Sequence, residues 1–224
     1  MPSLRSHIGM LAVALATLGF DAHARAGIVG TKDDFQSGTV NDWYGGTITA
    51  NVGNGVGGAA DRFLIVQTNG NTAGSGSHLA IHNSETRWNG NYIAEGVTGS
   101  TVDLRNMGTT TLNMRLVIFG LGTRYTSTTG ISLAPGSGWQ HLTFPVSQSS
   151  LTRVLGTGAY ADVVGSVNQI MFRHDDGTPS SGGTTVNGMV GIDNITAIPA
   201  PGAAGLLAGG MVIGARRRRP ATTR

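Results

Sequence analysis

The sequence predicts an all-β protein that folds as a two-sheet, jelly-roll-like sandwich, and three observations support this fold class. Glycine accounts for 36 of the 224 residues, about 16% against a usual share of roughly 7%. Charged residues make up only 12% of the chain, where about 25% is ordinary. Short alternating or apolar runs recur between Gly, Asn, Asp and Ser clusters, and no helical period is sustained.

Composition and charge exclude several classes of protein. Cysteine is absent, which removes disulfides, thiol nucleophiles, iron–sulfur clusters and thiolate zinc sites. The positive net charge of +3 comes from the termini alone, which hold seven of the 15 basic residues and only one of the 12 acidic ones. Residues 27–197 therefore carry a net charge of −3. Because a domain that binds nucleic acid needs a basic face, no nucleic-acid partner is expected.

Residues 1–26 are predicted to be a secretory signal peptide. A basic start precedes the uncharged run 8–20, and small residues follow it. These features and an A-x-A site are the marks of such a signal. Signal peptidase is expected to cut between Ala26 and Gly27, with cleavage after Ala24 as the second choice. The alternative is a buried helix or a membrane anchor. As a helix this run would rise only about 20 Å, which is short of the roughly 30 Å hydrocarbon core of a bilayer.

Residues 27–197 are predicted to form a single β-sandwich domain with nine strands. Gly, Asn, Asp and Ser clusters mark the turns between the strands. The irregular spacing of the strands fits two packed sheets. Only the segments 85–91 and 149–155 are predicted to form short helices. The predicted strands are 47–52, 62–67, 78–82, 100–104, 111–119, 130–133, 139–146, 167–173 and 189–195.

The C-terminus carries a second predicted signal, at 198–219, followed by a tail at 220–224. The prolines lack the N–H that a continuing strand would need. An apolar helix followed by arginines stops transfer through a membrane and keeps its basic end in the cytoplasm. The parts, in order, are Pro199, Ala200 and Pro201, the apolar run 202–215, and the cluster of Arg216, Arg217, Arg218 and Arg219.

This order of parts closely resembles the PEP-CTERM sorting signal of Gram-negative bacteria, in which a proline motif precedes an apolar helix and an arginine cluster. Ala200 stands where the name-giving motif has glutamate. The resemblance implies a precursor anchored in the inner membrane, processing by an exosortase near the proline motif, and a final place on the cell surface or outside the cell. The alternative is a C-terminal membrane anchor without processing.

A second resemblance covers the central domain. The sequence DDFQSGT at 33–39, followed by Trp43, resembles the opening of carbohydrate-binding-module-like jelly rolls, and GIDNI at 191–195 resembles their closing strand. The resemblance implies that the first and last strands pair. It also implies a structural Ca²⁺ held by Asp34 and Asp193, since carboxylate oxygens suit this ion. The alternative is that the opening aspartates cap a turn and that Asp193 bonds the backbone.

Aromatic residues provide the candidate sugar contacts. Trp88 and Tyr92, in the polar stretch TRWNGNY, are predicted to be an exposed pair on which sugar rings stack. Trp43 and Trp139, at strand entrances, are predicted to lie in the core.

No enzyme is expected from the sequence. No serine stands in a G-x-S-x-G motif, and the histidines at 78, 82, 141 and 174 are scattered. The adjacent aspartates at 33–34 and 175–176 would point to opposite sides of a strand, whereas glycosidase carboxylates face each other across a cleft. We expect a non-enzymatic surface or matrix protein associated with exopolysaccharide. The alternatives are a carbohydrate-binding module with a specific glycan ligand and a matrix glycoside hydrolase.

Overall fold

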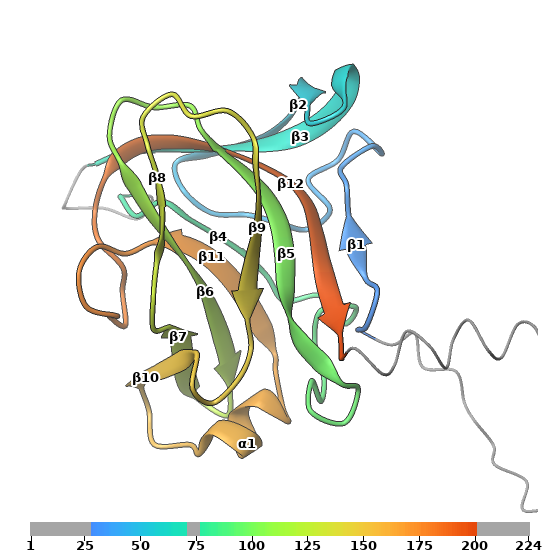
Figure 1. The fold of residues 1–224 in the computed structure, drawn as a ribbon, viewed down its shortest axis with the longest axis vertical. Coiled ribbons are helices and arrows are strands. Elements are labelled where there is room, and N and C mark those ends of the chain that lie inside the picture. Colours follow the sequence, from blue (N-terminus) through green and yellow to red (C-terminus); the bar gives the residue numbers. More distant parts are fainter. Residues whose placement is uncertain (1–27, 71–76, 201–224) are drawn as a thin grey trace, which may run out of the picture.

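The computed structural model describes residues 28–70 and 77–200, which form a sandwich of two antiparallel sheets (Figure 1). The predicted all-β, two-sheet sandwich is thereby confirmed. The signal peptide, the apolar run at 202–215 and the arginine cluster lie outside the described residues. Among the residues that are described, no helix is long and apolar enough to cross a membrane.

The first sheet, here called sheet A, has the central strand β12 near the end of the chain. Its strands, in order, are β2 (Ile48–Gly55), β3 (Gly58–Asn69), β12 (Asn187–Pro199), β5 (Val97–Asn106) and β9 (Gln140–Pro145), with β1 (Lys32–Asp33) also paired to β12. Lys32 lies opposite Thr196, and Asp33 lies opposite Ile195. The predicted pairing of the first and last strands is therefore confirmed.

The second sheet, sheet B, packs against sheet A, and the short helix α1 (Tyr160–Val164) lies at one end of the sandwich (Figure 1). The strands of sheet B, in order, are β10 (Leu151–Leu155), β7 (Thr123–Ser127), β6 (Leu112–Gly120), β11 (Gln169–His174) and β4 (Ala80–Asn83), with β8 (Ile131–Leu133) also paired to β6.

Both predicted helices are wrong. The segment 149–155 contains β10, in which Leu151 is buried while Arg153 and Leu155 are exposed. The segment is a strand because β10 pairs antiparallel with β7, with Leu151 opposite Ser127. The segment 85–91 consists of turns that end where Gly90 bridges to Val167. The helix α1 was not predicted because its five residues are too few to establish a period.

The core lies between the sheets and includes the indole ring of Trp43. This ring meets Trp88 edge to face, with centroids 5.7 Å apart, and Phe172 at 6.0 Å. The prediction that Trp43 is a core residue is confirmed. Trp139 is only half-buried and packs at 5.0 Å against Phe63 on the outer face of sheet A, so the prediction for Trp139 is wrong.

The opening motif builds a buried hydrogen-bonded hub around Asp33. One carboxylate oxygen, Oδ2, accepts bonds at 2.8 Å from the indole N–H groups of both Trp43 and Trp88. The guanidinium of Arg87 donates to the same oxygen at 3.3 Å. By contrast, the half-exposed Asp34 lies 3.8 Å from Lys32. The prediction that the adjacent aspartates at 33–34 point to opposite sides is confirmed, because Asp33 is buried and Asp34 is half-exposed.

Pro199, the first residue of the predicted proline motif, is the last residue of β12 and pairs with Val97. The strand therefore extends beyond its predicted end at 195. Ala200 continues alongside the segment that precedes β5 and donates its N–H to the carbonyl of Gly96 at 2.7 Å. The missing N–H of proline is consistent with the end of the ladder at this point.

Candidate functional site

The predicted sugar-stacking pair is buried. Trp88 is 1% exposed and Tyr92 is 3% exposed, so the expectation that they form an exposed pair is wrong. The Trp88 indole N–H donates to the carboxylate of Asp33, and the Tyr92 hydroxyl donates to the Trp88 carbonyl at 2.7 Å. Burial raises the pKa of Tyr92. The polar neighbours lie in surface turns while both aromatic rings point inward, which local composition cannot reveal.

The two predicted calcium ligands have different neighbours. The carboxylate of Asp34 lies beside Lys32 and accepts the backbone N–H of Gln36 at 3.3 Å. Asp193 is fully buried near Asp61. Within residues 28–70 and 77–200, no group of three or more His, Asp or Glu side chains is placed to hold a metal ion. The calcium site therefore stays a prediction without a set of ligands in the described chain.

Asp193 is a buried carboxyl that lacks a full set of donors. Its Oδ1 accepts the N–H of Asn194 at 2.7 Å, while Oδ2, with the backbone N–H of Val56 nearby, accepts no hydrogen bond of normal geometry. Burial, with a smaller contribution from the negative charges of Asp61 and Asp103, raises the pKa of Asp193 to about 7. The ionised form is therefore unfavourable in the folded protein.

This raised pKa makes stability depend on pH. The folded carboxyl holds its proton up to a pKa of about 7, whereas its unperturbed pKa is 3.8. The free energy of unfolding therefore falls as the pH rises from about 4 to 7. Asp193→Asn should remove this loss and be more stable than wild type at pH 8, by up to about 4 kcal/mol. Urea unfolding at pH 5 and pH 8 measures the difference, and an equal effect of the substitution at both values would contradict it.

The outer face of sheet B carries a cavity of about 350 Å³, within the size range of roughly 300–1,000 Å³ that is usual for ligand sites. We call it the sheet B groove. Side chains two residues apart on β4 and β11 share this face. The groove is lined by Gly45, Gly46, His78, Ala80, His82, Arg124, Met171, Arg173, Ser181 and Gly182.

Strand register explains how these residues meet. Met171 of β11 lies opposite His82 of β4, and Arg173 lies opposite Ala80. His78 and His82, which the sequence left scattered, line the same groove. Burial lowers the pKa of His82, so this ring is neutral at pH 7.

One wall of the groove is the segment before β2. Tyr44 exchanges backbone hydrogen bonds with His82, at 3.2 and 3.0 Å. Gly45 then passes so close to β4 that an added Cβ would lie 2.1 Å from the carbonyl oxygen of Ala80, at a φ of +152° that favours glycine. The Tyr44 ring is 51% exposed and meets the His82 imidazole edge to face, with centroids 4.1 Å apart. An aromatic face thus stands beside the groove.

The opposite wall is the loop between β11 and β12, which arginines hold in place. Arg124 and Arg173 each donate to the carbonyl of Ser181 at 2.9 Å. The Arg124 guanidinium also lies over the Phe119 ring, 4.8 Å from its centroid. The groove therefore combines guanidinium groups and open backbone with an exposed aromatic ring at its side, and these group types orient a polar ligand.

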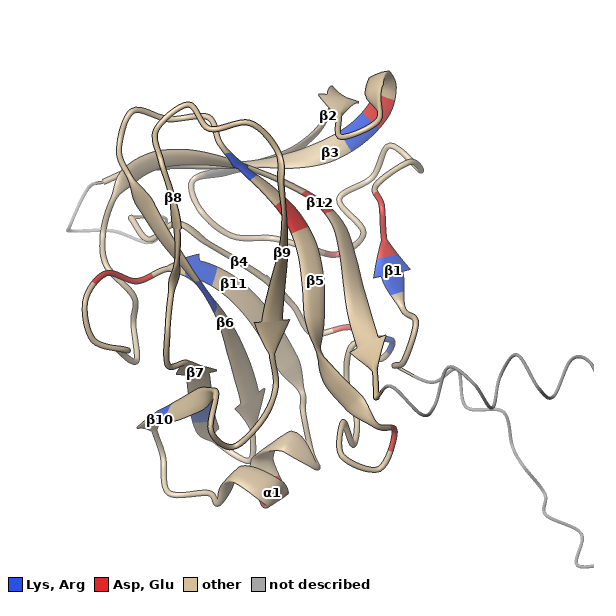
Figure 2. Ribbon diagram, viewed as in Figure 1, with Lys and Arg blue, Asp and Glu red and all other residues tan. Residues whose placement is uncertain are grey.

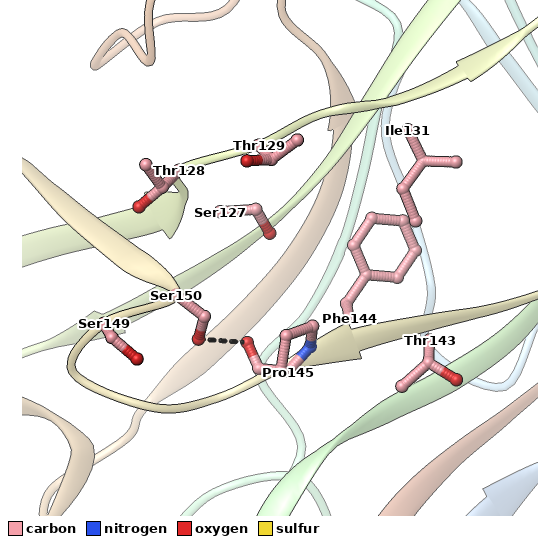
Figure 3. A pocket seen from close by; sticks show the side chains of 9 residues that line it. All are labelled: Ser127, Thr128, Thr129, Ile131, Thr143, Phe144, Pro145, Ser149 and Ser150. Atoms are coloured by element: carbon pink, nitrogen blue, oxygen red, sulfur yellow. Dashed lines mark hydrogen bonds between the residues drawn. The ribbon is translucent and has the colours of Figure 1, made fainter.

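A second cavity, of about 280 Å³, opens between β9 and the strands of sheet B (Figure 3). Hydroxyl groups surround it, but several of them already bond within the protein. Ser150 donates to the Pro145 carbonyl at 3.0 Å, and Ser127 donates to Leu116 at 3.3 Å. The aromatic ring in this cleft, Phe144, is buried. The cleft therefore lacks the exposed aromatic ring that stands beside the sheet B groove.

A third cavity contains two aspartates, Asp33 and Asp42, with Arg87 between them. Arg87 lies 3.3 Å from Asp33 and 3.6 Å from Asp42. Because two indoles and a guanidinium already bind Asp33, this carboxylate is a structural acceptor. A glycosidase needs one carboxyl that carries a proton and another that is free to act on the sugar, and this pair does not have that arrangement.

Sequence reasoning missed Tyr44, Arg124 and Arg173 as site residues. They come from three segments that meet only through strand pairing and the loop after β11. One signal in the sequence was available, the alternation in β11. Ile170 and Phe172 face the core, so Met171 and Arg173 between and after them face outward.

Comparison with known proteins relates this architecture to solved structures. No protein-family model and no curated protein matches the chain. An exo-β-agarase aligns with a TM-score of 0.54 and 13% identity over 75% of this chain, which spans 24% of the agarase. The solution structure of a family 11 carbohydrate-binding module aligns with a TM-score of 0.50 and 19% identity, over 80% of this chain and 98% of the module. The domain has the fold of such a module.

A further solved structure is the family 11 module from Clostridium thermocellum in complex with a β-1,3-1,4-mixed-linked tetrasaccharide. It has 21% identity, a TM-score of 0.49, and coverage of 77% of this chain and 97% of the module. At these identities the likeness concerns the fold, because one fold hosts many functions.

Proposed function

We propose that this protein is a non-catalytic glycan-binding domain and that the sheet B groove is its binding face. The observation that carries the proposal is the half-exposed Tyr44 ring beside a cavity lined by arginine, histidine and glycine backbone. A sugar ring can place its C–H face on the tyrosine while its hydroxyls bond to Arg124 and to groove backbone. The fold shared with a carbohydrate-binding module supports the same reading.

The setting of this activity is a proposal from the sequence. The predicted signal peptide and the PEP-CTERM-like C-terminus support export, exosortase processing and retention at the cell surface or in an extracellular matrix. The exopolysaccharide of such a matrix is then the ligand that the domain meets first.

Replacing Tyr44 tests the binding face. Tyr44→Ala should weaken glycan binding by about 3- to 10-fold, since an aromatic contact contributes roughly 0.5–1.5 kcal/mol. Tyr44→Phe should retain binding because the ring face remains. The matched control is Ile93→Ala, which removes a 50% exposed side chain that does not line the groove. Affinity electrophoresis in a panel of polysaccharides measures the effect, and equal retardation of wild type and Tyr44→Ala would contradict the proposal.

A further inference from the structure

The two sheets differ in charge. The strands of sheet B contain four arginines, at 115, 124, 153 and 173, and no acidic residue. The strands of sheet A contain three basic and four acidic residues. Figure 2 shows this asymmetry as blue without red on the strands of sheet B. The net negative charge of the central domain therefore conceals a basic face, the outer side of sheet B, where Arg115, Arg124 and Arg173 lie.

Neutralisation of the arginines on this face is incomplete. Arg115 and Arg173 lie directly opposite each other on β6 and β11, where like charges repel. One buried carboxylate, that of Asp175, pairs with both arginines and lies 3.8 Å from Arg115 and 3.2 Å from Arg173. Arg115 also has four backbone carbonyls as acceptors. Arg173 donates to the carbonyls of Ser180 and Ser181 and to Asp175, but its buried Nε has no hydrogen-bond partner.

Arg124 adds a third positive charge. Its hydrogen bond to the Ser181 carbonyl uses one N–H group of the five that a guanidinium carries, and no carboxylate in the described chain forms an ion pair with it. The other acidic side chain near this face, Asp176, is exposed and lies 3.3 Å from the His174 ring instead. Both Arg124 and Arg173 line the groove, whose lining residues include no acid.

We infer that the sheet B groove binds an acidic glycan, one that carries carboxylate or sulfate groups, through the half-buried Arg124, with the positive charge of the fully buried Arg173 close by. This inference rests on the proposed function and adds the class of ligand. Planar guanidinium groups match carboxylate and sulfate oxygens in a bidentate manner. Asp175 alone does not balance the positive charges of these arginines, and a ligand anion would supply further negative charge. A glycan is favoured over a nucleic acid because the domain as a whole is acidic and carries the module fold.

Matched polysaccharides test the inference with the full-length protein. Polygalacturonate is compared with its methyl-esterified form, and a sulfated galactan with the same galactan after desulfation. Each pair keeps the backbone and changes only the charge, so the two arms distinguish carboxylate from sulfate. Isothermal titration should show at least one acidic form binding about tenfold or more tightly than its neutral partner. This preference should shrink when salt is raised from about 0.05 to 0.5 M.

Three variants at two arginines locate the effect. Arg124→Gln should lower affinity for the acidic form about tenfold and affinity for the neutral form much less, because glutamine can still hydrogen-bond to sugar hydroxyls but carries no charge, and Arg124→Lys should restore part of the loss for the acidic form. Arg105→Gln is the matched control, because Arg105 is also half-buried and lies over aromatic rings, Trp139 at 5.5 Å and Phe63 at 5.8 Å, but on sheet A. It should leave both affinities unchanged.

The outcomes separate this inference from the proposed function. Equal or tighter binding of both neutral polysaccharides would overturn the acidic ligand while leaving a glycan-binding domain. Absence of binding to all four polysaccharides would overturn both proposals. Binding of a single-stranded DNA oligonucleotide as tightly as the best acidic polysaccharide would also overturn the inference, because the groove would then bind any polyanion.

Discussion

Asp33→Ala is expected to lower the free energy of unfolding by about 3–5 kcal/mol. The carboxylate is 5% exposed and is the acceptor for the indole N–H groups of Trp43 and Trp88 and for Arg87. Its removal leaves two buried donors and a guanidinium without their acceptor. It also leaves a gap where β1 joins β12, so packing around Trp43 should loosen as well.

The neighbouring residue provides the control. Asp34→Ala removes the same side chain from a half-exposed position beside Lys32, and exposed pairs of this kind contribute less than about 1 kcal/mol. Urea unfolding monitored by tryptophan fluorescence measures both variants, since two of the three tryptophans contact the hub. Similar unfolding free energies for the two variants would show that the hub is not a major source of stability.

Asp175→Ala is expected to cost a similar amount, about 3–5 kcal/mol. Asp175 is fully buried between Arg115 and Arg173 and accepts the hydroxyl of Ser180 at 2.7 Å. Without it, two buried guanidinium groups face each other across adjacent strands with no carboxylate. The loop around Ser180, which forms one wall of the sheet B groove, loses its anchor in the same change.

Asp176→Ala is the matched control for this second substitution. Its carboxylate is mostly exposed and is paired with His174, so the expected loss is below about 1 kcal/mol. Thermal unfolding followed by circular dichroism compares the two variants. If Asp175→Ala unfolded at the same temperature as Asp176→Ala, the buried charge cluster would have no special role in stability.

The sequence predicted those features of the fold that depend on local pattern. Alternation identified most strands, and the opening and closing motifs indicated that β1 and β12 pair, which the register of Asp33 and Ile195 confirms. Local pattern failed where tertiary contacts decide. The segment at 149–155 is short enough for either structure and becomes a strand because β7 offers an open edge.

The candidate site was harder to predict. Trp88 lies among polar residues yet points inward, because its indole N–H has Asp33 as a buried acceptor 55 residues earlier in the chain. Tyr44 and Arg124 approach the same groove from segments 80 residues apart in the sequence. Only the pairing of Tyr44 with His82, and the position of the loop after β11, bring them to one face.

The position of the bound glycan tests the central claim most directly. Backbone amide chemical shifts of the full-length protein, recorded during titration with an oligosaccharide of the tightest-binding polysaccharide, report which residues the ligand meets. We predict that the largest changes fall on Tyr44, His82, Met171 and Arg124, around the sheet B groove. Changes confined to the outer face of sheet A, around Arg105 and His141, would contradict the account.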